Sequence, residues 1–371
     1  MSPPESAVLQ PEDPLSAAFT DAVGRVLATF VDEQAPALAA MGPELGAVQT
    51  MATQLLAGGK RLRPAFCVWG FVAADGLPAD EPTALLRAAA SLDLLHVSAL
   101  VHDDVMDASD VRRGQPAAHR QFEAQHAGSA RLGDAAAFGR AGAILLGDLL
   151  VMWSVQLLQQ CGLEPAVLAA ATPIAETMRT EVTCGQYLDI VAQAQPLGED
   201  VGRALDEAER VVEYKSARYT VSRPCQLGAA LAGGDDRLQT ALAAYGSPLG
   251  RAFQFRDDEL GVFGDAALTG KPVGDDLREG KRTVLVAHAY AHASPAGQSL
   301  LRTRLGDPDL DPSGVADLQQ VIVESGARDA VEAMIEQGYE RSLAALAAAD
   351  LTDPGRQGLT ALAEAAVRRT F

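Results

Sequence analysis

The residues best suited to chemistry in this chain are acids at the end of an apolar stretch. The apolar run from Ala88 to Val101 leads directly to Asp103, Asp104 and Asp107. Without proline or glycine, this run predicts a buried helix, on which Asp103 and Asp107 share one face. Crowded carboxylates need cations, and magnesium commonly shares such oxygen ligands with substrate phosphates. The simpler interpretation is a helix end that points into solvent.

A second acid cluster ends another expected helix far along the chain. Asp257 and Asp258 lie near the end of the helix expected from Leu238 to about Leu260, and Gln254 comes about one turn before Asp258. Two carboxylate clusters that face each other can hold about two or three Mg²⁺ ions. The sequence therefore suggests a metal site built from two distant segments.

Basic residues lie in separate groups along the chain. These groups are Lys60 and Arg63 within Gly58–Pro64, the pair Arg112 and Arg113, and the single lysines Lys215, Lys271 and Lys281. Glycines allow the backbone to turn tightly, and arginine suits bidentate contacts with phosphate oxygens. Each group alone is also explained as a solvated turn or as neutralisation of nearby aspartates. Together with the acid clusters, they predict a diphosphate site and a second site for another phosphorylated substrate.

The elements that position these residues are expected to be helices. Apolar residues recur at helical spacing, and no stretch shows strand periodicity. Helices are expected over residues 14–40, 45–56, 64–74, 81–106, 138–161, 172–191, 200–218 and 238–260, with several more up to the C-terminus. Residues 1–13 carry several prolines and acids and predict a flexible tail. We expect an all-α protein with one domain over residues 14–371, a bundle of antiparallel helices around a central apolar cavity.

Composition narrows the classes of function. Of the 371 residues, 48% are hydrophobic and 5% aromatic, and the formal net charge is −19. This charge argues against nucleic-acid partners and anionic membranes, although local basic residues decide whether a phosphate binds. The four cysteines lack metal-type spacing, and we find no signal peptide and no apolar run able to span a bilayer. We therefore predict a cytoplasmic protein without a transmembrane segment.

An apolar interior beside a diphosphate site implies a substrate with a diphosphate head and a hydrocarbon tail. The chain resembles the trans-isoprenyl diphosphate synthases (polyprenyl synthetases), most closely the geranylgeranyl diphosphate synthases, from about Leu45 to Leu346. The motifs that carry the resemblance, in the family's order, are Gly58–Pro64, Asp103–Asp107 with Arg112–Gly114, Gly147–Asp148, Gly185–Gln186 with Asp189, Lys215, Phe253–Gln254 with Asp257–Asp258, Gly270–Lys271 and Gly280–Thr283.

The resemblance implies the isoprenoid synthase fold and a homodimeric enzyme that condenses isopentenyl diphosphate with an allylic diphosphate (dimethylallyl, geranyl or farnesyl). It implies that the Mg²⁺ ligands are Asp103, Asp107 and Asp257, and that Asp104 and Asp258 support catalysis. It implies that the allylic diphosphate is held by Arg112, Lys215, Ser216, Gln254, Lys271 and Lys281, with Arg112, Lys215 and Lys271 also catalytic. It implies that isopentenyl diphosphate is held by Lys60, Arg63, His96 and Arg113.

Two positions depart from the family's pattern. Gly261 stands where the family often has a third aspartate in the second cluster, and Asp265, about one turn later, is a candidate replacement. Ser216 follows Lys215 where threonine is usual, but its hydroxyl is kept, so we expect little change.

The residues before the first cluster bear on product length, because in this family their side chains lie on the tunnel wall. Ser98 and Ala99 are small enough to let a chain grow past them. The cluster also lacks the two-residue insertion of many bacterial short-chain enzymes, which disfavours a farnesyl-length product. Leu95, Met152 and Trp153 are candidates for the tunnel floor. We expect geranylgeranyl diphosphate, with a longer polyprenyl diphosphate as the alternative.

Two other functions remain open. A non-catalytic subunit of a heteromeric synthase would carry degraded aspartates, whereas both clusters are largely intact here. A terpene cyclase shares the helical fold, but it usually lacks the basic motif at Gly58–Pro64 and the pair Arg112 and Arg113.

Overall fold

Helices make up 78% of the protein in a computed structural model that describes residues 8–198, 201–264 and 273–368. The first half contains α1 (Ala17–Met41), η1 (Pro43–Leu45), α2 (Gly46–Leu56), α3 (Leu62–Asp75), α4 (Thr83–Met106), α5 (Ala118–Ala127), α6 (Ala135–Gln159) and α7 (Pro165–Gln193). The second half contains α8 (Val201–Val211), η2 (Val212–Ser222), α9 (Arg223–Leu231), α10 (Asp236–Phe263), α12 (Asp275–Glu279), α13 (Val284–His292), α14 (Pro295–Arg304), α15 (Pro312–Glu324), α16 (Ala327–Ala348) and α17 (Asp353–Val367). The predicted all-α class is confirmed.

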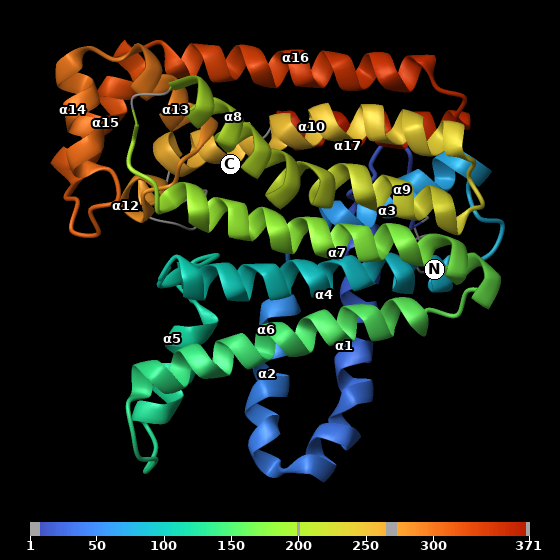
Figure 1. Cartoon of the computed structure of the whole chain (residues 1–371). Coiled ribbons are helices and arrows are strands. Elements are labelled where there is room, and N and C mark those ends of the chain that lie inside the picture. Colours follow the sequence, from blue (N-terminus) through green and yellow to red (C-terminus); the bar gives the residue numbers. More distant parts are fainter. Residues whose placement is uncertain (1–7, 199–200, 265–272, 369–371) are drawn as a thin grey trace, which may run out of the picture.

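Helix α4 lies at the centre of the site-bearing half, between α6 on one side and α7 on the other (Figure 1). It packs extensively against α6, where Ser98 Oγ donates a hydrogen bond to the carbonyl oxygen of Gly147 at 2.8 Å. A Cβ added at Gly147 would overlap the imidazole ring of His102. The glycine of the Gly147–Asp148 motif therefore allows α6 to approach α4 closely.

One long helical path replaces the helix predicted over residues 200–218. It runs without a break through α8, η2 and α9 to Leu231, and η2 has the wider turns of a π-helix. Such turns are rare and occur mostly at functional sites. Glu181 of α7 accepts hydrogen bonds from Arg218 Nη1 at 2.7 Å and from Arg223 Nε at 2.8 Å. These ion pairs hold η2 and the start of α9 against α7.

A small antiparallel hairpin follows the first acid cluster. It pairs β1 (Val111–Arg112) with β2 (Gln115–Pro116). Strands of two residues are too short to show strand periodicity, which agrees with its absence from the sequence. Gly114 has a left-handed φ of 72° in the turn of the hairpin, as does Arg113 at 53°, which places two adjacent arginines in a fixed turn.

The apolar core is one continuous cluster that draws on most helices. Val8 and Leu9 pack against this core, so the flexible tail predicted up to residue 13 does not extend over them. Residues 1–7 lie outside the described part of the chain. The prediction of one domain over residues 14–371 stays a prediction.

Two helices are long and apolar enough to cross a membrane by length and composition alone. They are α4 and α6, which the sequence-based search for an apolar run had not picked out. In α4, 72% of the most apolar window is buried inside the fold, and in α6 the share is 44%. Core helices of soluble proteins pass the same test, so these two helices are weak evidence for a membrane span.

Candidate active site

The first acid cluster occupies the C-terminal end of α4, as predicted. Asp103 Oδ1 accepts hydrogen bonds from Lys215 Nζ at 3.0 Å and from Gln186 Nε2 at 2.8 Å. Although burial raises the pKa of the Asp103 carboxyl, the cations Lys215, Lys281 and Arg112 hold it well below its usual range. Three motifs that lie far apart in the sequence therefore converge on one ionised carboxylate.

Lys215 comes from the π-helix and bridges two acids. Its Nζ lies 2.6 Å from Asp189 Oδ2 on α7, in addition to its contact with Asp103. A Cβ added at Gly185 would overlap the backbone nitrogen of Lys215. The glycine of the Gly185–Gln186 motif thus lets α7 and η2 approach closely enough for this bridge.

Asp104 of the first cluster binds Arg112 of the hairpin. Arg112 Nε donates to Asp104 Oδ1 at 2.9 Å, and Arg112 Nη2 donates to the same oxygen. Arg112 Nη2 also lies 3.8 Å from Asp103 Oδ2. Because two nitrogens of one guanidinium grip one buried carboxylate, the geometry gives Asp104 the task of holding Arg112.

Lys281 connects the first cluster to the elements after α10. Its Nζ lies 3.5 Å from Asp107 Oδ2, 3.5 Å from Asp276 Oδ1 and 2.7 Å from Glu279 Oε2. Burial and the neighbouring Asp103 raise the pKa of the Asp107 carboxyl to about 6. Asp107 Oδ2 is buried and receives no hydrogen bond within the described residues, although it lies within ion-pair distance of Lys281.

The second acid cluster lies near the end of α10, as predicted, and its two aspartates differ in exposure. Asp257 is half-buried, whereas Asp258 is buried and accepts a hydrogen bond from Gln254 Nε2 at 2.7 Å. Burial, together with Asp276 and Asp257, raises the pKa of the Asp258 carboxyl to about 8. Asp258 is therefore suited to support the cluster from inside the fold.

The structure accounts for the glycine that departs from the family's pattern. A Cβ added at Gly261 would overlap the Asp276 carboxylate, which belongs to α12. Asp276 therefore brings a carboxylate to the place beside α10 where the third aspartate is missing. The candidate replacement Asp265 lies outside the described residues, and so does Lys271, which was predicted to bind the allylic diphosphate.

Four arginines, Arg61, Arg63, Arg112 and Arg113, surround His96 where α3, α4 and the hairpin meet. We call this group the second basic cluster, to distinguish it from the lysines at the first acid cluster. Burial and the cations Arg63, Arg113, Arg112 and Arg61 hold the pKa of His96 well below its usual range. Arg63 and Arg113, two of the residues expected to bind isopentenyl diphosphate, are thus close enough to influence His96, as is Arg112, which was expected to bind the allylic diphosphate. Such a concentration of guanidinium groups favours an anion.

Not all of the basic residues at 58–64 face a ligand. Arg61 is buried and its Nη1 lies 2.7 Å from Asp93 Oδ2, so it joins α3 to α4. Gly59 has a left-handed φ of 94°, and a Cβ there would lie 3.3 Å from the Arg113 guanidinium. The glycine turn that precedes Lys60 therefore lies beside Arg113. Lys60 and Arg113 are both among the residues expected to bind isopentenyl diphosphate.

The expected residues of the product tunnel fall into different environments. Leu95 and Ser98 are buried, and Ala99 is half-buried. Trp153 is buried edge-on to Phe30 of α1, with ring centroids 6.1 Å apart. Met152 lies on the outer face of α6 and is 60% exposed, so within this single chain it is not a floor of the interior.

The carboxylates fit a metal that shares its ligands with a substrate. Within the described residues, no group of three or more histidines, cysteines or acids is arranged to hold an ion by itself. Asp103 and Asp107 nevertheless lie one turn apart, and Asp107 has a buried oxygen without a donor. Magnesium usually binds through one or two carboxylates together with phosphates and water, so this arrangement suits magnesium with a diphosphate.

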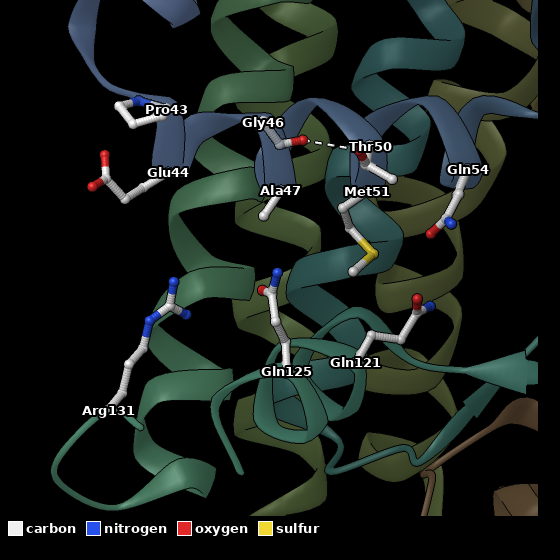
Figure 2. A pocket seen from close by; sticks show the side chains of 10 residues that line it. All are labelled: Pro43, Glu44, Gly46, Ala47, Thr50, Met51, Gln54, Gln121, Gln125 and Arg131. Carbon is white, nitrogen blue, oxygen red and sulfur yellow. Dashed lines mark hydrogen bonds between the residues drawn. The ribbon is translucent and has the colours of Figure 1, made fainter. Parts of the chain in front are cut away.

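Two cavities of the structure have no aspartate in their linings. A groove of about 510 Å³ runs between η1, α2, α5 and the loop after it (Figure 2). Its lining residues are Pro43, Glu44, Gly46, Ala47, Thr50, Met51, Gln54, Gln121, Gln125 and Arg131. None of them belongs to the predicted site, and the central apolar cavity stays a prediction.

Comparisons with known proteins agree with this geometry. The polyprenyl synthetase family matches residues 46–323. A (2E,6E)-farnesyl diphosphate synthase of Mycobacterium tuberculosis is 37% identical over 242 residues, which cover 65% of this chain but only 60% of that relative. A geranylgeranyl diphosphate synthase of Methanosarcina mazei is 31% identical over 291 residues, which cover 77% of this chain and 79% of that protein.

A solved structure extends the similarity to nearly the whole chain. It is a geranylgeranyl pyrophosphate synthase of Corynebacterium glutamicum, complexed with isoprenyl diphosphate and magnesium. The two chains are 40% identical with a TM-score of 0.91, covering 97% of this chain and 100% of that one.

Proposed function

The chain belongs to the polyprenyl synthetase family, a family of prenyltransferases, and from this premise we propose that it condenses isopentenyl diphosphate with an allylic diphosphate. The observation that carries the proposal is the convergence on Asp103 of Lys215 and Gln186, with Lys281 linking Asp107 to α12. This arrangement alternates carboxylates with cations, as a site for a metal–diphosphate group requires.

The allylic substrate loses its diphosphate first. The oxygens of the diphosphate contact Arg112, Lys215, Gln254 and Lys281, with Ser216 and Lys271 as further contacts. As the allylic C–O bond breaks, these fixed cations neutralise the charge that develops on the leaving group. The apolar residues of the core exclude water, which would otherwise quench the carbocation.

The second substrate supplies the electrons for the new bond. Lys60, Arg63, His96 and Arg113 hold the diphosphate of isopentenyl diphosphate, so that its double bond faces the allylic carbon. The double bond attacks that carbon, a new C–C bond forms, and a proton is lost to the released diphosphate. No side-chain nucleophile takes part.

Asp103, Asp107 and Asp257 would hold about two or three Mg²⁺ ions, which such a site shares with the substrate phosphates. When bound, magnesium supplies positive charge that stabilises the leaving diphosphate. Asp104 holds Arg112 in place, and Asp258 supports Gln254.

For the product, we propose geranylgeranyl diphosphate, with a longer polyprenyl diphosphate as the alternative. The small residues Ser98 and Ala99 support a product longer than farnesyl diphosphate. The relatives described above include a farnesyl and a geranylgeranyl synthase, so their names alone leave the length open. The test is to supply Mg²⁺, isopentenyl diphosphate and each allylic starter, and to identify the dephosphorylated alcohols by mass. A twenty-carbon alcohol from all starters is expected, and a fifteen-carbon end product would contradict the assignment.

The same assay separates the two other functions. A terpene cyclase would release a cyclic hydrocarbon without consuming isopentenyl diphosphate. A non-catalytic subunit would give no product with any starter until a second chain is added. The paired Arg112 and Arg113 and the intact aspartates favour the elongating enzyme over both.

We also propose a cytoplasmic homodimer. Apolar side chains gather on the outer face of α6, where Ile144, Leu145 and Met152 are 44%, 68% and 60% exposed. A group of exposed apolar side chains on one helix face favours burial against another chain. A second copy of this chain packed on that face would also explain the incomplete burial of α6. Light scattering should give twice the chain mass, and Leu145→Glu should give the monomer mass. A wild-type chain that is monomeric at micromolar concentration would contradict the dimer.

A further inference from the structure

Tyr219 touches two of the residues that the proposed function assigns to isopentenyl diphosphate. It lies in η2, one turn after Lys215, and is buried. Its hydroxyl lies 2.8 Å from His96 Nδ1, and the Arg63 guanidinium carbon lies 4.2 Å from the centre of its ring. Arg63 Nη2 also donates to Thr220 Oγ1 at 2.9 Å. The π-helix thus joins the allylic site, through Lys215, to the second basic cluster.

The surroundings of His96 decide how this hydrogen bond is oriented. His96 is neutral, because burial and four nearby arginines keep its pKa well below its usual range, so its ring carries one proton. Within the described part of the chain, His96 Nδ1 is the one hydrogen-bond partner of the Tyr219 hydroxyl, and Nε2 has none. If Nδ1–H donated, the buried hydroxyl hydrogen would lack an acceptor, which is costly.

The cation beside Tyr219 favours the same orientation. Arg63 lies over the face of the phenol ring and makes its hydroxyl more acidic, hence a better donor. Burial still raises the pKa of Tyr219 to about 12, so the hydroxyl keeps its proton at neutral pH. The hydroxyl therefore donates to Nδ1, and the imidazole proton resides on Nε2.

We propose that Tyr219 is a positioning residue for the second substrate. Its hydroxyl fixes the imidazole of His96 with the proton on Nε2, where that N–H can donate to a diphosphate oxygen, and its ring holds Arg63 beside the same group. The proposal rests on the proposed function, since it concerns the site assigned to isopentenyl diphosphate. Tyr219 itself need not touch either substrate.

The test is steady-state kinetics of Tyr219→Phe, with each substrate varied in turn. The change removes only the hydroxyl, so the KM for isopentenyl diphosphate should rise about tenfold while the KM for the allylic substrate stays within about twofold. In a His96→Gln background the same change should have little further effect, because an amide N–H donor needs no partner to set its tautomer. Additive losses in the two backgrounds would overturn the proposal.

Tyr245→Phe provides the matched control. The Tyr245 hydroxyl is also buried and donates to the Leu359 carbonyl oxygen at 2.7 Å, so its partner is neither His96 nor Arg63. Its loss should lower stability without changing the KM for isopentenyl diphosphate. An equal rise in both variants would show that Tyr219 acts only through general stability.

A tautomer measurement separates this proposal from the proposed function. In ¹⁵N-histidine-labelled wild-type protein, with His96→Gln used for assignment, the His96 signals should report a proton on Nε2. A proton on Nδ1 would overturn the proposal even in an active enzyme. A wild-type enzyme that elongates no starter would overturn the proposed function, whatever the tautomer.

Discussion

Gly261 offers a test of how the second acid cluster is built. In the interior of a helix, glycine to alanine ordinarily stabilises a protein by about 1 kcal/mol. At position 261, the new methyl group would overlap Oδ2 of the Asp276 carboxylate. Asp276 is only 9% exposed, and its Oδ1 lies 3.5 Å from Lys281 Nζ. Overpacking of this kind costs about 1–3 kcal/mol. The net expectation for Gly261→Ala is a destabilisation of about 0–2 kcal/mol.

Gly24→Ala is the matched control for this change. Gly24 lies inside α1, and a Cβ there would lie 3.8 Å from Arg61 Nη2, which is ordinary contact. Urea unfolding of both variants should place Gly261→Ala about 1–3 kcal/mol below Gly24→Ala. Equal stabilisation of the two variants, with full activity, would refute the placement of Asp276 over Gly261.

Gly261→Asp extends the test to function. This change restores the aspartate that the family often has, so an argument from the motif alone expects an equal or better enzyme. The structure predicts the opposite, because the new carboxylate competes with Asp276 for space and places a second negative charge beside that carboxylate. We expect at least a tenfold loss of kcat/KM, and a more active variant would contradict this account.

Three further changes test other parts of the structure. Asp258→Asn should stabilise the protein by about 2 kcal/mol at pH 8.5 and by much less at pH 5. The pKa of Asp258 is raised in the folded state, so ionisation of this carboxyl destabilises the fold as the pH rises from about 4 to about 8. Equal effects at both pH values in urea unfolding would contradict this. Gly185→Ala should lower kcat at least tenfold with the fold kept by circular dichroism, because its methyl group displaces the backbone at Lys215; unchanged kcat would show that the close approach is dispensable. Trp153→Ala should lengthen the product, and unchanged product size by mass would remove Trp153 as the tunnel floor.

The sequence predicted the helices and assigned Lys215 to the same site as Asp103. Lys215 does donate a hydrogen bond to Asp103, whereas the equivalent contact of Gln186, which the sequence offered only as part of a motif, was not predicted. Helical periodicity and acid spacing are local properties, so they are readable along the chain. The family resemblance then supplied the pairing between segments that spacing alone does not determine.

The parts that the sequence did not predict depend on distant packing. Asp276 over Gly261 joins two elements separated by a long connection, and no local pattern shows which carboxylate fills the space beside a glycine. Within the basic motif at Gly58–Pro64, Arg61 forms a buried ion pair with Asp93 and so has a structural role. The motif alone does not distinguish Arg61 from the neighbouring Lys60 and Arg63. Tyr219 was not singled out in the sequence and lies just beyond the helix predicted over residues 200–218, since its contact with His96 depends on how η2 packs.

The central claim is that Asp103 and its cations catalyse condensation of two diphosphates, and one measurement tests it most directly. Radiolabelled isopentenyl diphosphate is supplied with Mg²⁺ and farnesyl, geranyl or dimethylallyl diphosphate, and the label in acid-labile prenyl product is counted for wild type and Asp103→Asn. We expect incorporation by the wild type and a loss of about a thousandfold or more in the variant. No incorporation by the wild type with any starter, or near-normal incorporation by Asp103→Asn, would contradict the claim.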